Sequence, residues 1–211
     1  MERIDARRES PGRIAEHVAA VIFGGGTVIF PTDTVYGIGC DPVDRAAVER
    51  IYALKGRPRA KPLVLHLGSV TEALEYAPEN ELAHLYAGAM LPGPLTLVVA
   101  RPAHVPSAVT AGLPSVGLRV PAHALSLVIF ERCGPLAATS ANRSGAEPYI
   151  GTGELAGLGE ADLLVDAGPT PLGAESSVLD VTGREPRLLR EGVLSAAMID
   201  SIFRHSTAHA R

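Results

Sequence analysis

The sequence predicts an α/β fold in a single domain, a twisted mixed β-sheet with flanking helices that takes in residues 1–211. A chain of 211 residues buries about 70% of its unfolded surface, which is enough for one full hydrophobic core. Its hydrophobic content of 46% and charged content of 20% are those of an ordinary globular protein. Short apolar runs alternate with segments whose apolar residues recur at helical spacing, and this alternation is typical of α/β proteins.

The first predicted elements are a helix, a strand and a loop. The helix begins at Pro11, because Ser10 and Pro11 form a start signal, and it ends at the triple glycine of residues 24–26. The β-branched run over residues 27–31 predicts a short strand. The next segment, PTDTVYGIGCDP, holds many turn-forming residues and is predicted to be a loop leaving the end of that strand.

A second helix follows, capped by Asp44 and ended by Gly56, with its apolar residues in one stripe. A basic loop, KGRPRAKP, comes next and leads into the apolar strand PLVLHL at 62–67.

The rest of the chain continues the alternation of helices and strands. The last three strand candidates are closely spaced, so we expect them to form antiparallel pairs on the mixed sheet. The predicted elements are helices at 71–76 and 79–90, strands at 95–100 and 116–121, a helix at 123–133, a strand at 136–142, a loop at 143–153, strands at 163–168, 177–183 and 186–192, and a helix at 195–203.

Charge and cysteine content exclude several classes of protein. The net charge of −4 and the pI of about 6.0 argue against a surface that binds nucleic acid through general phosphate neutralisation. Cys40 and Cys133 form no C-x-x-C motif, which suits buried thiols in a reducing compartment. The N-terminus is charged, and the longest uncharged stretch is broken by glycine and proline, so a cytoplasmic protein without a membrane segment is expected.

Lysine is confined to one loop. The chain has 19 lysine and arginine residues, and both of its lysines, Lys55 and Lys61, lie in KGRPRAKPL beside Arg57 and Arg59. Ammonium and guanidinium groups both bind phosphate, the second in a bidentate fork. A solvated basic loop is the plain alternative, but the clustering of lysine favours an anion-binding site.

Familiar nucleotide and metal motifs are absent from the sequence. There is no Walker A pattern, and Gly151, Gly153 and Gly157 give only a partial dinucleotide fingerprint. The seven histidines are scattered, with no H-E-x-x-H, so no metal site built by the protein is predicted. His66 differs from the others because it lies inside an apolar strand, where either a structural or a functional role is open.

The segment LAATSANRSG places polar groups at and after a strand end. Its residues Thr139, Ser140, Asn142 and Ser144 could bind phosphate or ribose, and the alternative is an Asx turn. A glycosylation site at Asn142 is discarded because a secretory context is missing. Further on, Ser176 and Arg190 flank strand candidates, where polar residues are most often surface or turn residues. No nucleophile with an activating base is evident.

Taken together, seven segments in order resemble the YrdC/Sua5 family. They are PTDTVYGIGCDP, KGRPRAKPL, LPGPLTLV, VGLRVP, TSANRSG, ESSVLDV and LLREG, within a motif core of about residues 24–192. The resemblance implies a YrdC-like fold and L-threonylcarbamoyladenylate synthase activity. In that reaction L-threonine, bicarbonate or carbon dioxide, and ATP with Mg²⁺ give threonylcarbamoyl-AMP and pyrophosphate. The product then serves N6-threonylcarbamoyladenosine formation in tRNA by a separate transferase complex, so this chain need bind tRNA only weakly or indirectly.

The resemblance also implies roles for particular residues. The ATP site would comprise Lys55, Arg57, Lys61, Ser140, Asn142 and Arg190, with Lys55 and Arg57 as the catalytic pair. The threonine site would comprise Thr32, Thr34, Tyr36, His66, Arg119 and Ser176, with Arg119 facing the carboxylate. Catalysis would rest on positioning and charge neutralisation, which agrees with the lack of a nucleophilic side chain.

Two departures from the family pattern and two alternatives complete the sequence argument. Some relatives carry a long C-terminal extension, whereas this sequence ends soon after LLREG, which implies a minimal single-domain form. Ser177 stands where the family often has threonine. The alternatives are a noncatalytic RNA-binding module with a locally basic cleft, and a carbamoyl-transfer domain like that of hydrogenase-maturation proteins.

Overall fold

The computed structural model describes residues 1–153, 155 and 157–209, and within these residues the chain forms ten strands and six helices. The strands are β1 Glu2–Asp5, β2 Val28–Phe30, β3 Gly37–Cys40, β4 Val64–His66, β5 Leu95–Ala100, β6 Ser115–Arg119, β7 Leu136–Ser140, β8 Leu163–Asp166, β9 Ser177–Asp180 and β10 Arg187–Arg190. The helices are α1 Pro11–Phe23, α2 Arg45–Lys55, α3 Val70–Glu75, α4 Glu81–Met90, α5 Ala124–Cys133 and α6 Ala196–His209. None of these helices is both long and apolar enough to cross a membrane.

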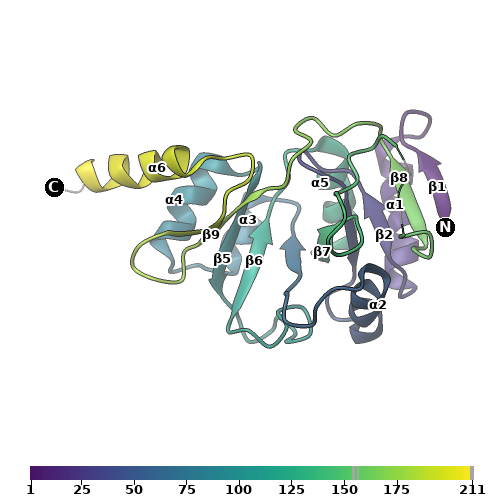
Figure 1. The fold of residues 1–211 in the computed structure, drawn as a ribbon, viewed down its shortest axis with the longest axis horizontal. Coiled ribbons are helices and arrows are strands. Elements are labelled where there is room, and N and C mark those ends of the chain that lie inside the picture. Colours follow the sequence, from purple (N-terminus) through teal and green to yellow (C-terminus); the bar gives the residue numbers. More distant parts are fainter. Residues whose placement is uncertain (154, 156, 210–211) are drawn as a thin grey trace.

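All of these strands belong to one mixed sheet in the order β1-β8-β2-β3-β7-β4-β6-β5-β9-β10, which confirms the predicted fold class. The sheet runs along the molecule, with β1 at one end and β10 and α6 towards the other (Figure 1). The predicted antiparallel pairing is confirmed for β9 and β10. It is wrong for β8, which lies parallel to both β1 and β2.

Two strands were missing from the sequence prediction. β1 was missed because it consists largely of charged residues and has no apolar run. Such a strand is possible here because β1 lies at the edge of the sheet and its first residues are exposed. β3 lies in the segment predicted as a loop, and it is fully buried between β2 and β7. Its glycines serve close packing and not a turn: a Cβ atom on Gly37 would lie 2.8 Å from Cζ of Phe30.

Apolar residues form two clusters around the sheet. One cluster joins α1 and α5 to β2, β7 and β8, and Cys133 is part of it. The larger cluster holds residues of α2, α3 and α4 with β3, β5 and β6, and includes Cys40. Both cysteines are free, buried thiols, as predicted. The predicted caps also form, since Ser10 accepts the Arg13 N–H and Asp44 accepts those of Ala46 and Ala47.

Candidate functional site

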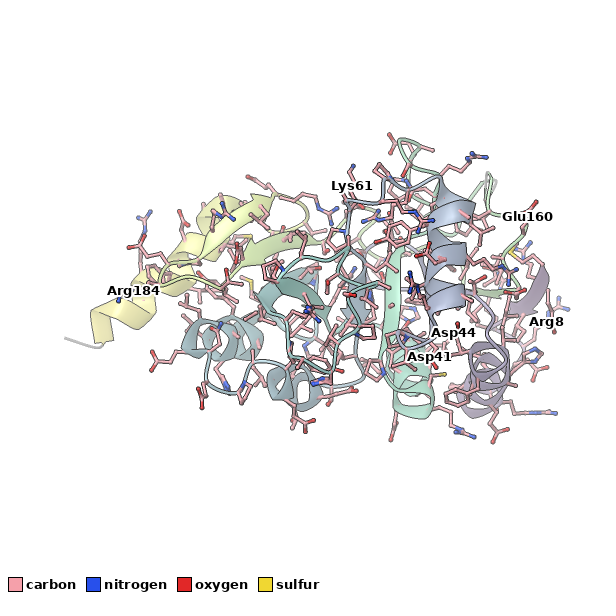
Figure 2. All side chains as sticks on the ribbon, turned by 90° about the horizontal axis from the view of Figure 1, so that it is seen from below. Arg8, Asp41, Asp44, Lys61, Glu160 and Arg184 are labelled. Atoms are coloured by element: carbon pink, nitrogen blue, oxygen red, sulfur yellow. The ribbon has the colours of Figure 1, made fainter. Side chains whose placement is uncertain are left out.

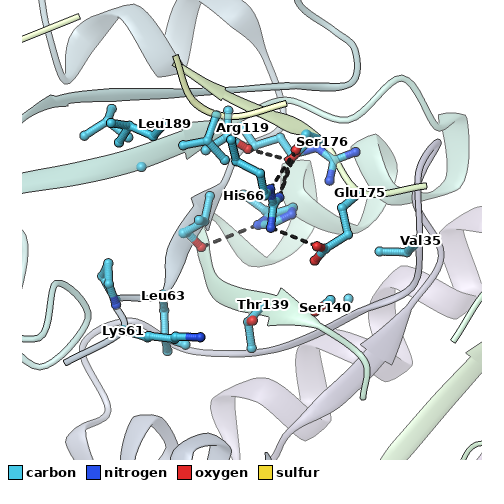
Figure 3. A pocket seen from close by; sticks show the side chains of 18 of the residues that line it. Val35, Lys61, Leu63, His66, Arg119, Thr139, Ser140, Glu175, Ser176 and Leu189 are labelled. Carbon is cyan, nitrogen blue, oxygen red and sulfur yellow. Dashed lines mark hydrogen bonds and ion pairs between the residues drawn. The ribbon is translucent and has the colours of Figure 1, made fainter. Parts of the chain in front are cut away.

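A cavity of about 400 Å³ lies over the middle of the sheet, a size suited to a small-molecule ligand. Side chains from β4, β5 and β6 line it, together with residues at β7, β9 and β10 and the basic loop (Figure 3). Strand alternation explains the lining, because successive side chains point to opposite faces. Leu65, Leu97 and Leu118 join the core, while their neighbours His66, Thr96 and Arg119 line the cavity.

The structure brings together candidate residues that lie far apart in the sequence. Three of them, Thr34, Lys55 and Asn142, do not line the cavity but are hydrogen-bonded to residues that do. The other candidates line it directly: Thr32, Tyr36, Arg57, Lys61, His66, Arg119, Ser140, Ser176 and Arg190. Their roles towards a ligand stay predictions.

One end of the cavity is built around Arg119. Sheet register places it directly beside His66 on the neighbouring strand. Its Nη2 donates to Oδ1 of Asp33 and to Oγ1 of Thr34, each at 2.6 Å. Burial lowers the pKa of Arg119 below its ordinary value, and the Asp33 carboxylate opposes that shift.

His66 is a neutral imidazole in this site. Burial and, to a lesser extent, the nearby Arg119 charge lower its pKa to about 3. The ring packs against Phe30 and Phe130, with centroids 5.7 Å and 6.1 Å away. His66 can therefore donate or accept a hydrogen bond at neutral pH but carries no charge there.

Ser176, just before β9, and Arg190, in β10, form a polar wall of the same cavity. The Ser176 hydroxyl is 2.9 Å from the Thr96 hydroxyl, and Arg190 donates to the Ser176 carbonyl at 2.8 Å and 3.1 Å. Arg190 also pairs with Glu175 at 3.0 Å, and Figure 3 shows the Glu175 carboxylate pointing into the cavity. The sequence prediction missed Thr96 and Glu175. For Thr96 the available signal was a hydroxyl at an alternating position of an apolar strand. For Glu175 it was a carboxylate next to the candidate residue Ser176.

The basic loop divides between the cavity and the surface. Arg57 donates from Nε to the Lys61 carbonyl at 3.1 Å and from Nη2 to the Pro62 carbonyl at 2.8 Å, and burial lowers its pKa. Lys61 lies exposed at the rim, and its side chain projects outward beside α2 (Figure 2). Arg59 lies outside the cavity, where it pairs with Glu49 and lies 5.2 Å over the Tyr52 ring. The solvated-loop interpretation thus suits Arg59 alone.

Lys55 holds the loop after β7 and is 2% exposed. Its ammonium donates to the carbonyl oxygens of Ser140 and Asn142, the second at 2.6 Å, and to Oδ1 of Asn142 at 3.0 Å. Burial, reinforced by the Arg57 charge, lowers the pKa of Lys55 to about 7, whereas these three acceptors favour the charged form. All three ammonium hydrogens are therefore directed at protein oxygens.

Tyr36 shapes the cavity wall through its own hydrogen bonds. Its hydroxyl donates to the Gly168 carbonyl at 2.7 Å and accepts the Ala167 N–H at 3.0 Å. The ring packs against Tyr149 with centroids 4.9 Å apart, and burial raises the pKa of Tyr36 to about 12. The phenol is thus a fixed neutral group.

The cavity is rich in cations. Glu175 is its only lining carboxylate among the described residues, against Arg57, Lys61, Arg119 and Arg190. In the described part of the chain no group of three or more His, Cys, Asp and Glu side chains is placed to hold a metal ion. The donor set therefore suits anionic ligands, with hydroxyls and a neutral imidazole at one end.

Comparisons with known proteins agree with this chemistry. A family model named Sua5_yciO_yrdC and described as "Telomere recombination" matches residues 20–192. The chain is 39% identical over 195 residues to a threonylcarbamoyl-AMP synthase of Pyrococcus abyssi and 37% identical over 196 residues to one of Bacillus subtilis. These alignments cover 90% and 88% of this chain but only 57% and 55% of those proteins.

A solved structure shares the fold. The crystal structure of P. abyssi Sua5 complexed with L-threonine superimposes with a TM-score of 0.85 at 38% identity. The superposition covers 95% of this chain and 59% of that one. This chain thus spans little more than half the length of these P. abyssi and B. subtilis proteins.

Proposed function

Since the chain belongs to the Sua5/YciO/YrdC family, as its match over residues 20–192 shows, we propose that it acts as a threonylcarbamoyl-AMP synthase. The substrates are L-threonine, bicarbonate or carbon dioxide, and ATP, and the second product is pyrophosphate. The observation that carries the proposal is one cavity with cationic groups at one part and a buried arginine, hydroxyls and neutral imidazole at another.

The cationic part suits the triphosphate. Arg57, Lys61 and Arg190 line the cavity, and each can donate charge-assisted hydrogen bonds to phosphate oxygens. Ser140 lines the same part, and its hydroxyl donates to Oδ1 of Asn142 at 2.7 Å. These groups neutralise charge that develops on pyrophosphate as it leaves the α-phosphorus.

The other part suits an amino acid. Arg119 is a partner for the α-carboxylate, and Ser176, Thr96 and Thr32 offer hydroxyls for the side-chain oxygen and the amine. The amine must be neutral to attack carbon dioxide, and it loses one proton to water as the carbamate forms. The carbamate oxygen then attacks the α-phosphorus in line, and the bond from this phosphorus to pyrophosphate breaks. Both steps require alignment of bound substrates, so fixed positions contribute most of the rate enhancement.

Lys55 then has a supporting role. Its ammonium fixes the carbonyls of Ser140 and Asn142 and does not line the cavity, so it orients the side of the cavity assigned to ATP. Mg²⁺ bound to the ATP phosphates would supply further charge neutralisation. The product passes to a separate transferase that acts on tRNA, and the net charge of −4 fits a chain that does not itself hold tRNA tightly.

Binding measurements test this assignment. Titration of L-threonine and of ATP with Mg²⁺ into the protein should show saturable binding of both, with L-serine and L-valine binding more weakly than L-threonine. Loss of ATP binding in Arg57→Ala with threonine binding retained supports the division of the cavity. Binding of neither substrate by the folded protein contradicts the proposed function.

A further inference from the structure

Asp33 and Arg119 form an ion pair that is almost completely buried. Asp33 is 3% exposed and Arg119 is 5% exposed. Arg119 uses both hydrogens of Nη2, one on Oδ1 of Asp33 and one on Oγ1 of Thr34, each at 2.6 Å. Nε of Arg119 and Oδ2 of Asp33 are buried and have no hydrogen-bond partner among the described residues.

Stability alone does not account for this arrangement. Burying two charges removes their hydration, and replacing a buried ion pair by apolar residues is often neutral or stabilising. Two unpaired polar atoms add to the cost. The pair therefore points to a role for an oriented arginine.

Backbone hydrogen bonds fix Asp33 itself. Its carbonyl accepts the Leu172 N–H at 3.0 Å. On its two sides, Thr32 Oγ1 accepts the Thr34 N–H at 3.1 Å and donates to the Val35 carbonyl at 2.6 Å. The carboxylate thus projects from a loop with little freedom, whereas Arg119 is a long side chain at the end of β6.

The free end of Arg119 faces the cavity. Nη2 is saturated, and Nη1 makes no hydrogen bond with the described residues and is not among the buried unpaired atoms. Arg119 lines the cavity and Asp33 does not. A ligand carboxylate can therefore reach the guanidinium but not the Asp33 carboxylate.

We propose that Asp33 is a positioning residue, whose carboxylate holds Arg119 with Nη1 directed at the α-carboxylate of the amino-acid substrate. The inference rests on the proposed function, since it takes that carboxylate as the partner of Arg119. Without Asp33 the guanidinium has several rotamers available, and binding must then restrict them.

Asp33→Asn removes the charge while keeping the side-chain shape. We expect threonine affinity to fall about 10- to 100-fold, which corresponds to loss of one charge-assisted hydrogen bond, with ATP affinity unchanged. Asp33→Glu keeps the carboxylate and should recover most of the affinity. Asp162→Asn is the matched control. Asp162 forms an ion pair with Arg50, 2.7 Å between the charged atoms, and neither residue lines the cavity, so this substitution should leave both affinities unchanged.

A second measurement reports on Arg119 directly. In ¹⁵N-labelled wild-type protein the Arg119 guanidinium, assigned with Arg119→Lys, should show restricted rotation before threonine is added, and its signal should shift on addition. Because the measurement does not use Asp33→Asn, it can be made even if that variant does not fold.

The outcomes separate the two claims. Restricted rotation with selective loss of threonine affinity in Asp33→Asn supports the inference. A freely rotating Arg119, or normal threonine affinity in folded Asp33→Asn, overturns it while leaving the proposed function in place. A wild-type protein that binds no threonine overturns the proposed function and, with it, the carboxylate partner named here.

Discussion

Replacing Lys55 by methionine tests whether this lysine organises the loop after β7. The substitution keeps a long side chain but removes three charge-assisted hydrogen bonds, to the Ser140 carbonyl and to two oxygens of Asn142. Each such bond contributes about 1.5–3 kcal/mol, and the ammonium no longer needs to be desolvated, which offsets part of the loss. We expect a net loss of about 2–4 kcal/mol in the free energy of unfolding.

The same variant should bind ATP about tenfold more weakly, because Ser140 and Asn142 lose their fixed positions. Urea unfolding measures the stability and calorimetric titration measures the ATP affinity. Arg59→Met is the matched control from the same loop, since Arg59 forms an exposed ion pair with Glu49 and should change stability by at most about 1 kcal/mol. Equal effects in both variants, or unchanged stability in Lys55→Met, would show that Lys55 does not organise the loop after β7.

Three further predictions follow from the site and its surroundings. Arg119→Ala should raise the threonine KM most and Arg57→Ala the ATP KM, and steady-state kinetics showing equal effects on both substrates would contradict the division of the cavity. The folded-state pKa of His66, about 3, lies below its unfolded value near 6.5, so unfolded chains bind the extra proton and stability falls as pH drops through this window. Urea unfolding at pH 6.5 and 4.5 should show a loss of roughly 2–3 kcal/mol that His66→Gln removes, and an equal loss in that variant would assign it elsewhere. Gly151→Ala should lower the free energy of unfolding by about 3 kcal/mol or more, because its Cβ would lie 1.9 Å from the Gly168 carbonyl oxygen. Gly153→Ala has open space around the new Cβ and should lower it by about 1 kcal/mol, and similar melting curves for the two variants would contradict this.

Local sequence signals predicted most helices and strands because their caps and periodicity are local. β3 was missed because its glycines resemble turn formers, and only the packing of the Phe30 ring against Gly37 shows why they are there. The parallel pairing of β8 with β1 and β2 was not predictable from spacing, since it depends on a connection that crosses the sheet. Long-range pairing therefore limited the fold prediction.

For the site, composition singled out the basic loop, and the family resemblance supplied most of the other residues. Neither predicted that Lys55 is directed at the loop carbonyls or that Asp33 lies behind Arg119. Both are contacts between segments more than 80 residues apart in the chain, which strand register and loop packing create. Residue identity thus predicted which groups gather in the site, and the structure adds how each is oriented.

Pyrophosphate release is the most direct measurement of the proposed synthase reaction. The protein is incubated with ATP, bicarbonate and Mg²⁺, with and without L-threonine, and the nucleotide product is identified by mass spectrometry. We expect release that depends on threonine, with threonylcarbamoyl-AMP as the product. No release by well-folded protein would contradict it, with salt-sensitive RNA binding then favouring an RNA-binding module and turnover of carbamoyl phosphate without threonine favouring a carbamoyl-transfer domain.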